Sequence, residues 1–255
     1  MKGSIAIPLL PLLALLGSTA CGVRLGDGNG NGGTDASTNG GDGGVQDDAA
    51  PDAPACANGR VVFLNFDGVT LTQGSPSDAT QNRARWMNIG QGTAPRYKTA
   101  AANRLQLIQD VTDGVRAQLS SFPVTVVTQR PATGPYVMIV LGGVASQVGS
   151  NYGSAVNQLD CGDAAKSDVA WISDNVGPTQ RVVNNAVGAI GFGLGLTATL
   201  DPLGCMCSWA NGCPPDNSVA CRLSPMINRD PNATQTCAGL TTQDEVATFT
   251  AAFCQ

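Results

Sequence analysis

The 255-residue sequence contains no histidine, and only one of its 19 acidic residues, Glu245, is a glutamate. Without histidine there is no imidazole base for a Ser-His or Cys-His nucleophile pair and no His-ligated zinc. A single glutamate likewise excludes a Glu–Glu glycosidase pair. These absences remove several hydrolase mechanisms before any motif is considered, and we predict no catalytic residue and no cofactor.

Basic residues are also scarce, with 14 Lys and Arg and a formal net charge of −5. The acidity is local, because residues 22–55 carry six Asp and one Arg, whereas residues 56–255 carry 12 basic and 13 acidic residues. A nearly neutral domain has no electrostatic footprint for a phosphate backbone. The sequence therefore predicts no nucleic-acid partner.

The longest N-terminal apolar run, residues 5–16, is too short to span a bilayer. It follows Lys2 and precedes the small residues 17–20, which is the layout of a signal peptide over residues 1–20. Ser18-Thr19-Ala20-Cys21 resembles a bacterial lipobox, with Ser18 in place of the usual Leu. We therefore expect an exported bacterial lipoprotein of the cell envelope, anchored to the outer membrane or cell surface through acylated Cys21.

Cysteine parity supports the lipid anchor, because an acylated Cys21 leaves an even number of the nine cysteines for disulfides. The disulfide candidates are Cys56, Cys161, Cys205, Cys207, Cys213, Cys221, Cys237 and Cys254. Eight cysteines allow 105 pairings, and the sequence does not choose among them. Six of the eight lie between Cys205 and Cys254, so we expect local loops to staple the C-terminal part.

Residues 21–55 comprise the lipidated cysteine and a Gly- and Asp-rich stretch that has almost no apolar side chain to bury. Such a composition predicts a flexible tether. Residues 56–255 are long enough for one domain with its own core.

Within this domain, short apolar runs predict buried strands and a helical stripe predicts a long helix before Pro123. The expected strands are residues 61–66, 124–128, 136–141 and 168–173, and the expected helices are residues 100–122 and a segment opening at Pro178. Residues 70–99 are expected to be irregular and fixed by Trp86. Thr242 and Glu245 form a capping-box pattern for a last helix. This order predicts an α/β fold with a single, mainly parallel sheet.

The stretch from Ala186 to Trp209 resembles the zinc-binding region of the metzincin metalloproteases, whose H-E-x-x-H-x-x-G-x-x-H motif precedes a methionine turn. With the motif glycine at Gly195, the ligand positions are Gly188, Phe192 and Ala198, and the general-base position is Ala189. Met206 lies where the methionine turn would be. The resemblance implies a metzincin-like, disulfide-stapled domain that has an active-site-type helix but lacks every metal ligand.

What the resemblance implies is a non-catalytic, pseudoprotease-like module that could still bind a peptide or protein segment along an edge strand. Two other functions remain open from the residues alone. One is a hydrolase or metallopeptidase with non-standard ligands, for which Asp67, Asp168 and Asp201 are the candidate carboxylates. The other is a purely structural envelope protein, in which the Gly-rich stretch is only a tightly packed core element.

Overall fold

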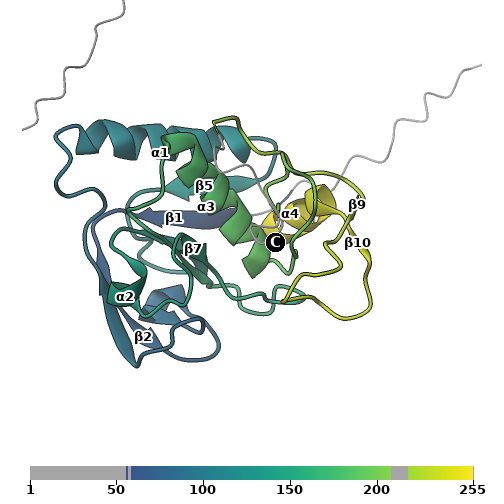
Figure 1. Ribbon diagram of the computed structural model, residues 1–255, viewed down its shortest axis with the longest axis horizontal. Coiled ribbons are helices and arrows are strands. Elements are labelled where there is room, and N and C mark those ends of the chain that lie inside the picture. The colour runs from purple at the N-terminus through teal and green to yellow at the C-terminus, as the bar shows by residue number, and fades with distance from the viewer. Residues whose placement is uncertain (1–55, 57–58, 208–217, 255) are drawn as a thin grey trace, which may run out of the picture. The chain divides into compact units, whose positions relative to one another are not determined.

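The computed structural model describes Cys56, residues 59–207 and residues 218–254 (Figure 1). The expected signal peptide, Cys21, the expected tether and Cys213 all lie outside these residues.

A five-stranded sheet with the order β5-β1-β6-β8-β7 forms the centre of the domain. The strands are β1 (Arg60–Asn65), β5 (Val124–Val127), β6 (Tyr136–Leu141), β7 (Ala155–Val156) and β8 (Val169–Ile172). The pairs β1–β5, β1–β6 and β6–β8 are parallel, and only the edge strand β7 runs antiparallel, beside β8. The predicted α/β fold with a mainly parallel sheet is therefore confirmed, as are the four expected strands.

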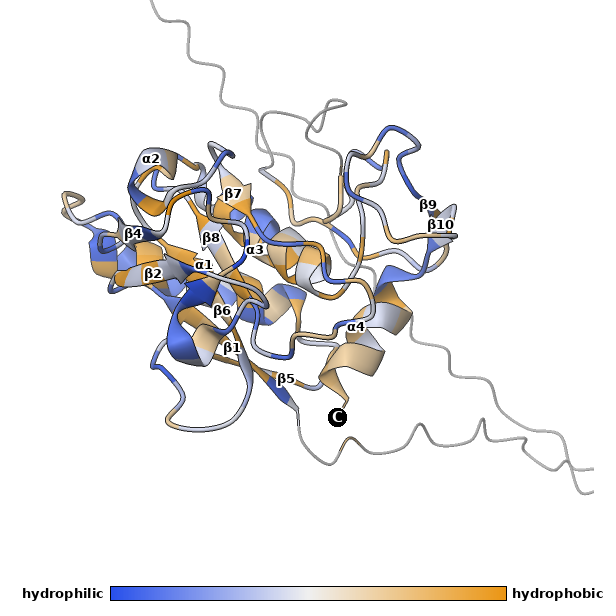
Figure 2. Cartoon of the chain, turned by 90° about the horizontal axis from the view of Figure 1, so that it is seen from below, coloured by the Kyte–Doolittle hydropathy of each residue, from blue (hydrophilic) through white to orange (hydrophobic). Residues whose placement is uncertain are grey.

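Both faces of this sheet are buried, which explains why its strands are continuous apolar runs rather than alternating patterns. In β1, Val62 and Leu64 belong to the cluster on the helical side, while Phe63 belongs to the cluster on the opposite side. The central strands are accordingly among the most hydrophobic parts of the cartoon (Figure 2).

Helices cover one face of the sheet. They are α1 (Arg104–Gln118), α3 (Thr179–Gly193) and α4 (Glu245–Phe253), while the short α2 (Ala145–Val148) lies beside β4 (Figure 1). Val115 of α1 and Val183 of α3 pack in one core with Phe249 of α4. Gly114 allows the close approach of α1 to α3, because a Cβ there would lie 2.6 Å from a methyl group of Val183.

The other face is covered by a small three-stranded sheet, so the expectation that residues 70–99 are irregular was wrong. This sheet consists of β2 (Val69–Gln73), β3 (Arg83–Ala84) and β4 (Gln91–Ala94), with the 3-10 turn η1 (Ala79–Gln81) between β2 and β3. Trp86 does fix the segment, because its buried indole N–H donates to the carbonyl oxygen of Val169 at 2.6 Å.

The start of the last helix also differs from the expectation. Thr242 belongs to the short strand β10 (Thr242–Gln243), which pairs with β9 (Ile227–Asn228), and the N-cap is Asp244. The Asp244 carboxylate accepts from the backbone N–H of Ala247 at 2.7 Å. Glu245 is fully buried and accepts from the backbone N–H of Ser224 at 2.9 Å, so it joins two segments instead of completing a capping box.

Seven disulfide candidates lie in the described residues, and all seven are disulfide-bonded. The pairs whose two partners are described are Cys56–Cys254, Cys161–Cys237 and Cys205–Cys221. Only Cys205–Cys221 is local, with a sequence separation of 16, whereas the other two bridge 198 and 76 residues. The expected stapling by local loops therefore holds for one of these three pairs. Because all seven described cysteines are disulfide-bonded, the protein belongs to an oxidising, exported location.

Among the described residues, no helix is both long and apolar enough to cross a membrane.

Candidate functional site

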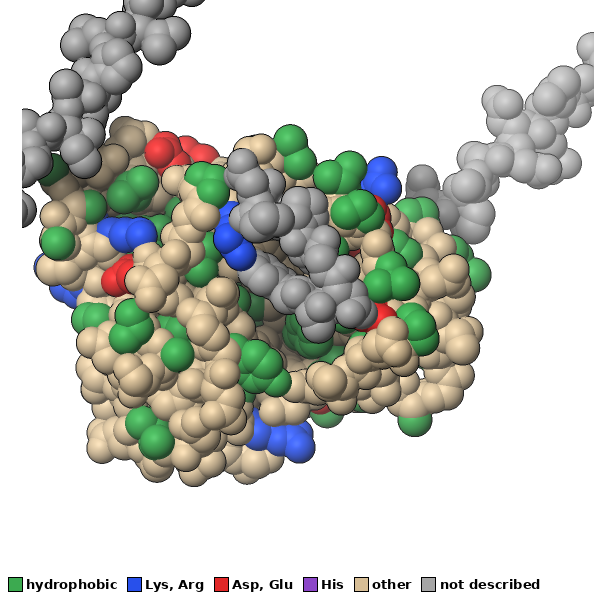
Figure 3. Space-filling model, viewed as in Figure 1, with side chains coloured by type: hydrophobic (Ala, Val, Ile, Leu, Met, Phe, Trp, Pro, Cys, Tyr) green, Lys and Arg blue, Asp and Glu red, His purple; other side chains and the backbone are tan. Residues whose placement is uncertain are grey.

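A cavity of about 460 Å³ lies between α3, the segment that contains β7, and two C-terminal loops. Its walls come from residues 152–157, from the α3 residues Asn184, Asn185, Gly188, Ala189 and Phe192, and from Ala198, Gly204, Cys205, Cys207 and residues 232–235. None of these residues is charged. Figure 3 shows that charged side chains are also sparse on the face of the molecule that carries α3. As lined by the described residues, the cavity is thus an uncharged and largely apolar hollow beside a sheet edge.

Helix α3 presents one of its faces to this cavity. Asn185, Gly188, Ala189 and Phe192 follow the spacing i, i+3, i+4, i+7, which places their side chains on one side of a helix. Although glycine is a poor helix former, α3 continues through Gly188 and Gly191 to Gly193. Burial of one side of α3 against the sheet stabilises the helix enough to offset these glycines.

The positions matched to the metzincin motif lie close together around this cavity. Gly188, Ala189, Phe192 and Ala198 all line it. Gly195 lies in the turn after α3 with φ +89°, a conformation that favours glycine, and a Cβ there would lie 2.9 Å from the carbonyl oxygen of Asp160.

Met206 is buried under the helix, with 1% of its surface exposed. A Cβ on Gly191 would lie 2.5 Å from the Met206 sulfur, so the thioether packs directly on the backbone of α3. The backbone carbonyl of Met206 accepts from the N–H of Thr199 at 2.7 Å, which fixes the loop that carries the methionine.

None of the four side chains at the ligand and general-base positions offers a metal-binding atom. Position 188 has no room for one either, because a Cβ there would lie 2.6 Å from the backbone carbonyl oxygen of Cys205. Over the described part of the chain, no group of three His, Cys, Asp or Glu residues is arranged to hold a metal ion.

The three candidate carboxylates do not share a site. Asp67 follows the carboxyl end of β1, is exposed and contacts Arg96 and Arg104. Asp168 precedes the amino end of β8, and because β1 and β8 run in the same direction these two residues lie at opposite ends of the sheet.

Asp201 lies in the segment after α3 and forms an ion pair with Arg222 at 2.9 Å. The Arg222 guanidinium and the N–H of Leu203 hold the pKa of Asp201 below its usual value, although partial burial opposes them. The geometry therefore gives no support to a hydrolase built on Asp67, Asp168 and Asp201.

Asp168 packs against the end of α3 at Gly193. Its burial raises its pKa to about 8, and the negative charge of Asp160 contributes in the same direction. A Cβ on Gly193 would clash with the carboxyl group of Asp168 and lie 2.7 Å from the amide nitrogen of Asn157. Asn157 in turn donates to the carbonyl oxygen of Ala189 at 2.8 Å and lines the cavity. Gly193 thus lets the loop before β8 approach the helix closely.

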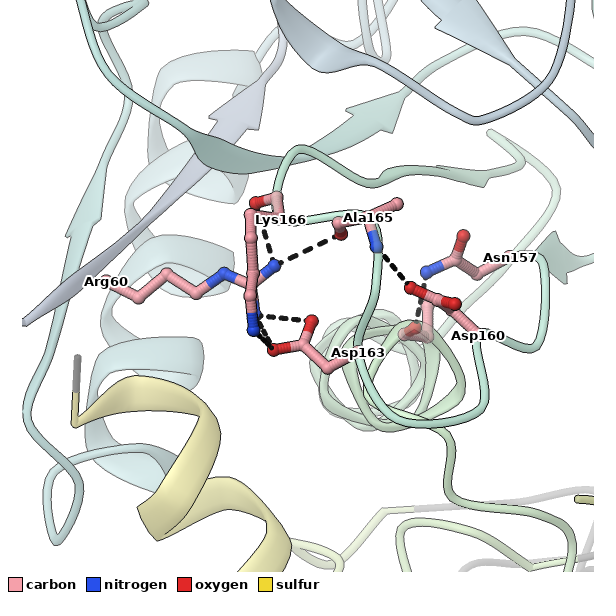
Figure 4. A network of polar contacts seen from close by, with 7 residues as sticks. Arg60, Asn157, Asp160, Asp163, Ala165 and Lys166 are labelled. Carbon is pink, nitrogen blue, oxygen red and sulfur yellow. Dashed lines mark hydrogen bonds and ion pairs between the residues drawn. The ribbon is translucent and has the colours of Figure 1, made fainter.

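Arg60, at the start of β1, holds that loop in place (Figure 4). Its guanidinium forms a two-oxygen contact with Asp163 at 2.8 and 2.9 Å and donates to the carbonyl oxygen of Lys166 at 2.7 Å. Asp160 accepts from the backbone N–H of Ala165 at 2.6 Å within the same loop. Since this loop begins at Asn157, the Arg60 contacts position one wall of the cavity.

Asn185 is one of the cavity residues that sequence reasoning missed. It is 5% exposed, and neither its amide nitrogen nor its amide oxygen has a hydrogen-bond partner in the described structure. The available signal was an asparagine one helical turn before Gly188 in an otherwise apolar run.

A comparison of the sequence with protein-family models found no match, and a comparison with curated proteins found none either.

Proposed function

We propose that this chain is a non-catalytic binding module, a metzincin-like core without its zinc site, which binds an extended peptide segment between β7 and α3. One observation carries the proposal. The four positions that would hold zinc ligands and the general base in a metzincin surround one uncharged cavity beside an edge strand, and they hold Gly, Ala, Phe and Ala.

The edge strand β7 supplies a way to hold an extended segment. Ser154 accepts from the N–H of Ser173 at 2.8 Å, so residue 154 directs its carbonyl toward β8. Adjacent residues of a strand direct their backbone groups to opposite sides, so the N–H and C=O of Ala155 face the open edge. Among the described residues, no turn, loop or side-chain group hydrogen-bonds to them, so they can pair with an added strand, which is one of the general ways in which proteins bind peptides.

Several further features of the site support binding without catalysis. Phe192 places an aromatic ring at a ligand position, and the Cys205 carbonyl occupies the space next to residue 188. The described lining also contains no carboxylate, imidazole or amine that could act as a general base or hold a metal ion. A cavity of this size and polarity suits an apolar or neutral segment.

The proposal includes the envelope location. Disulfides place the domain in an oxidising compartment, and the resemblance of residues 18–21 to a lipobox supports an acylated Cys21 that anchors the tether to a membrane. Mass spectrometry of the N-terminal peptide from extracted membranes should show a diacylated Cys21, and Cys21→Ser should release the protein from the membrane fraction. An unmodified residue 21 on a secreted product would contradict the anchor but not the binding function.

A display experiment tests the binding function. The mature chain, immobilised in its oxidised form, is incubated with a random heptapeptide library, and the selected peptides are synthesised and titrated. Ala155→Pro removes the outward N–H and should weaken every selected peptide, whereas the matched Ala155→Ser variant keeps the N–H and should bind as the wild type does. Melting curves verify that both variants fold.

Two results would overturn the proposal. One is the absence of any selected peptide that binds at the cavity. The other is about one tightly held zinc ion per purified chain together with cleavage of the selected peptides, which would indicate an active metallopeptidase. The structural-envelope alternative predicts the first of these results.

A further inference from the structure

We propose that Asn185 determines the specificity of this cavity and selects a neutral carboxamide side chain, Gln or Asn, from the bound segment. This inference depends on the peptide-binding function proposed above. It concerns which side chain the cavity accepts, a property that the metzincin resemblance does not address.

The first observation is that the Asn185 amide has unmet hydrogen-bonding capacity. The residue is 95% buried, since 5% of its surface is exposed, and both its amide nitrogen and its amide oxygen lack a partner among the described residues. Buried side-chain amides in folded proteins are normally hydrogen-bonded, because an unpaired buried donor or acceptor loses its water without replacement. Both amide atoms are themselves buried, so a ligand group pairs with them when the Asn185 side chain turns toward the cavity. The unpaired amide therefore indicates a group that arrives with the ligand.

The neighbouring Asn184 has hydrogen-bond partners, so the unpaired amide is a property of position 185. Asn184 also lines the cavity, but its amide oxygen accepts from the Gln118 and Gln180 side chains and from the N–H of Cys221. Its amide nitrogen donates to the carbonyl oxygen of Val219 at 2.9 Å. Asn184 is thus fully used in joining α3 to α1 and to the loop around Cys221, and Asn185 is not.

The position of Asn185 on the helix directs it to the ligand. Residues 185, 188, 189 and 192 share one face of α3, and residues 188 and 189 have only a hydrogen or a methyl group as side chain. The Cys205 carbonyl covers Gly188, so a segment would approach the helix over Ala189, between Asn185 at one end and the Phe192 ring at the other. The Gln235 side chain, whose buried amide oxygen is also unpaired, lies on the same cavity.

The chemistry of the lining selects the type of side chain. No described lining residue is charged, so a ligand carboxylate or ammonium group would lose its water without gaining a counter-charge. An aliphatic side chain would leave both amide atoms of Asn185 unpaired. A carboxamide carries a separate N–H donor and C=O acceptor, which match the oxygen and nitrogen of Asn185 in a reciprocal pair.

The test uses a positional-scanning library of acetylated, amidated heptapeptides with the oxidised mature chain. We expect Gln or Asn to be preferred at one position. Asn185→Leu should abolish that preference and weaken the selected Gln peptide roughly 10- to 100-fold, the range expected when a buried polar group loses its partner. Asn228→Leu removes an exposed amide outside the cavity lining and should leave the preference unchanged.

A second variant and a second readout guard against misfolding. Asn185→Asp keeps the size of the side chain but removes its donor, and should shift the preference toward Lys. Asn185→Leu should raise the melting temperature of the free protein, because an unpaired buried amide is replaced by an apolar group; a structural asparagine would lower it.

The outcomes separate this inference from the proposed function. Peptides that bind with no Gln or Asn preference, or a preference that survives both Asn185 variants, would overturn the role of Asn185 and leave peptide binding standing. The absence of any peptide bound at the cavity would overturn both.

Discussion

The backbone carbonyl oxygen of Cys205 faces Gly188 of α3 so closely that a Cβ on residue 188 would lie 2.6 Å from it. The carbonyl belongs to a loop held by the Cys205–Cys221 disulfide and by a hydrogen bond from the Cys205 N–H to the Arg222 carbonyl oxygen at 3.0 Å. It is therefore a fixed neighbour. Residue 188, the position of the first expected zinc ligand, cannot carry any side chain unless the loop or the helix moves.

Gly188→Ala tests this contact through the sign of its effect on stability. Helix propensity alone predicts that Ala stabilises a helix interior by about 1 kcal/mol relative to Gly. We expect the opposite, a loss of roughly 1–3 kcal/mol in the free energy of unfolding, because overpacking against a fixed backbone carbonyl forces a shift. Urea denaturation gives the value.

Gly90→Ala is the matched control, because no atom lies within 4 Å of the Cβ position there. It should change stability little or raise it slightly. A stabilising Gly188→Ala would show that the Cys205 loop moves easily and that residue 188 can carry a side chain.

The sequence predicted the central layer of the fold well, because that layer is determined by simple patterns. The apolar runs in β1, β6 and β8 are unbroken since both faces of the sheet are buried, and they are recognisable without tertiary information. The small sheet was missed because β2 buries Leu71 fully but leaves both its threonines exposed. One buried residue in a polar run gives too weak a periodicity to identify a strand.

For the candidate site, the sequence could predict only the arrangement of residues within one helix. Helical spacing places Gly188, Ala189 and Phe192 on one face, and the sequence suffices for that. The approach of Cys205 to Gly188 and the lack of partners at Asn185 depend on loops distant in sequence. Likewise, Glu245 was predicted to cap a helix, and only the fold reveals Ser224 as its buried partner.

The disulfides should differ in what they contribute to stability. In the loop-entropy model, a bridge that closes a loop of about 16 residues contributes about 3 kcal/mol and one that closes about 200 residues contributes about 5 kcal/mol. We therefore expect the Cys56→Ser/Cys254→Ser double variant to lose more stability than the Cys205→Ser/Cys221→Ser variant. Unfolding of both double variants in guanidinium chloride gives the two losses of stability. A larger loss for the Cys205→Ser/Cys221→Ser variant would mean that local effects at the cavity exceed chain entropy.

The contact between Arg60 and Asp163 should be important for stability, because both side chains are about nine-tenths buried or more, with 4% and 10% exposed. Arg60→Met removes the guanidinium partner of the buried Asp163 carboxylate and leaves Lys166 as a partner at 2.7 Å. We expect a loss of about 3 kcal/mol. Arg60→Lys should recover only part of it, because an ammonium group cannot reproduce the paired contact and the bond to the Lys166 carbonyl together. Full recovery by Lys would show that charge alone matters.

Asp168 should make the protein less stable as the pH rises through the neutral range. Its ordinary pKa is 3.8, whereas burial raises its folded-state pKa to about 8, with Asp160 adding to the shift. Between these values the folded chain binds one more proton than the unfolded chain. The free energy of unfolding therefore falls by up to about 1.4 kcal/mol per pH unit from about pH 4 to pH 8 and levels off above that.

Asp168→Asn isolates this contribution, because it keeps the size of the side chain and removes the titration. Glu245, whose pKa burial also raises, contributes in the same direction in both proteins. Urea titrations between pH 5 and pH 8 should show a shallower decline for the variant and, at pH 8, a variant more stable than the wild type. Parallel profiles would mean that Asp168 is already ionised in the folded state at neutral pH. Asp168 and Asn157 both pack against Gly193, so the contact between the loop and α3 would then have to accommodate a buried negative charge.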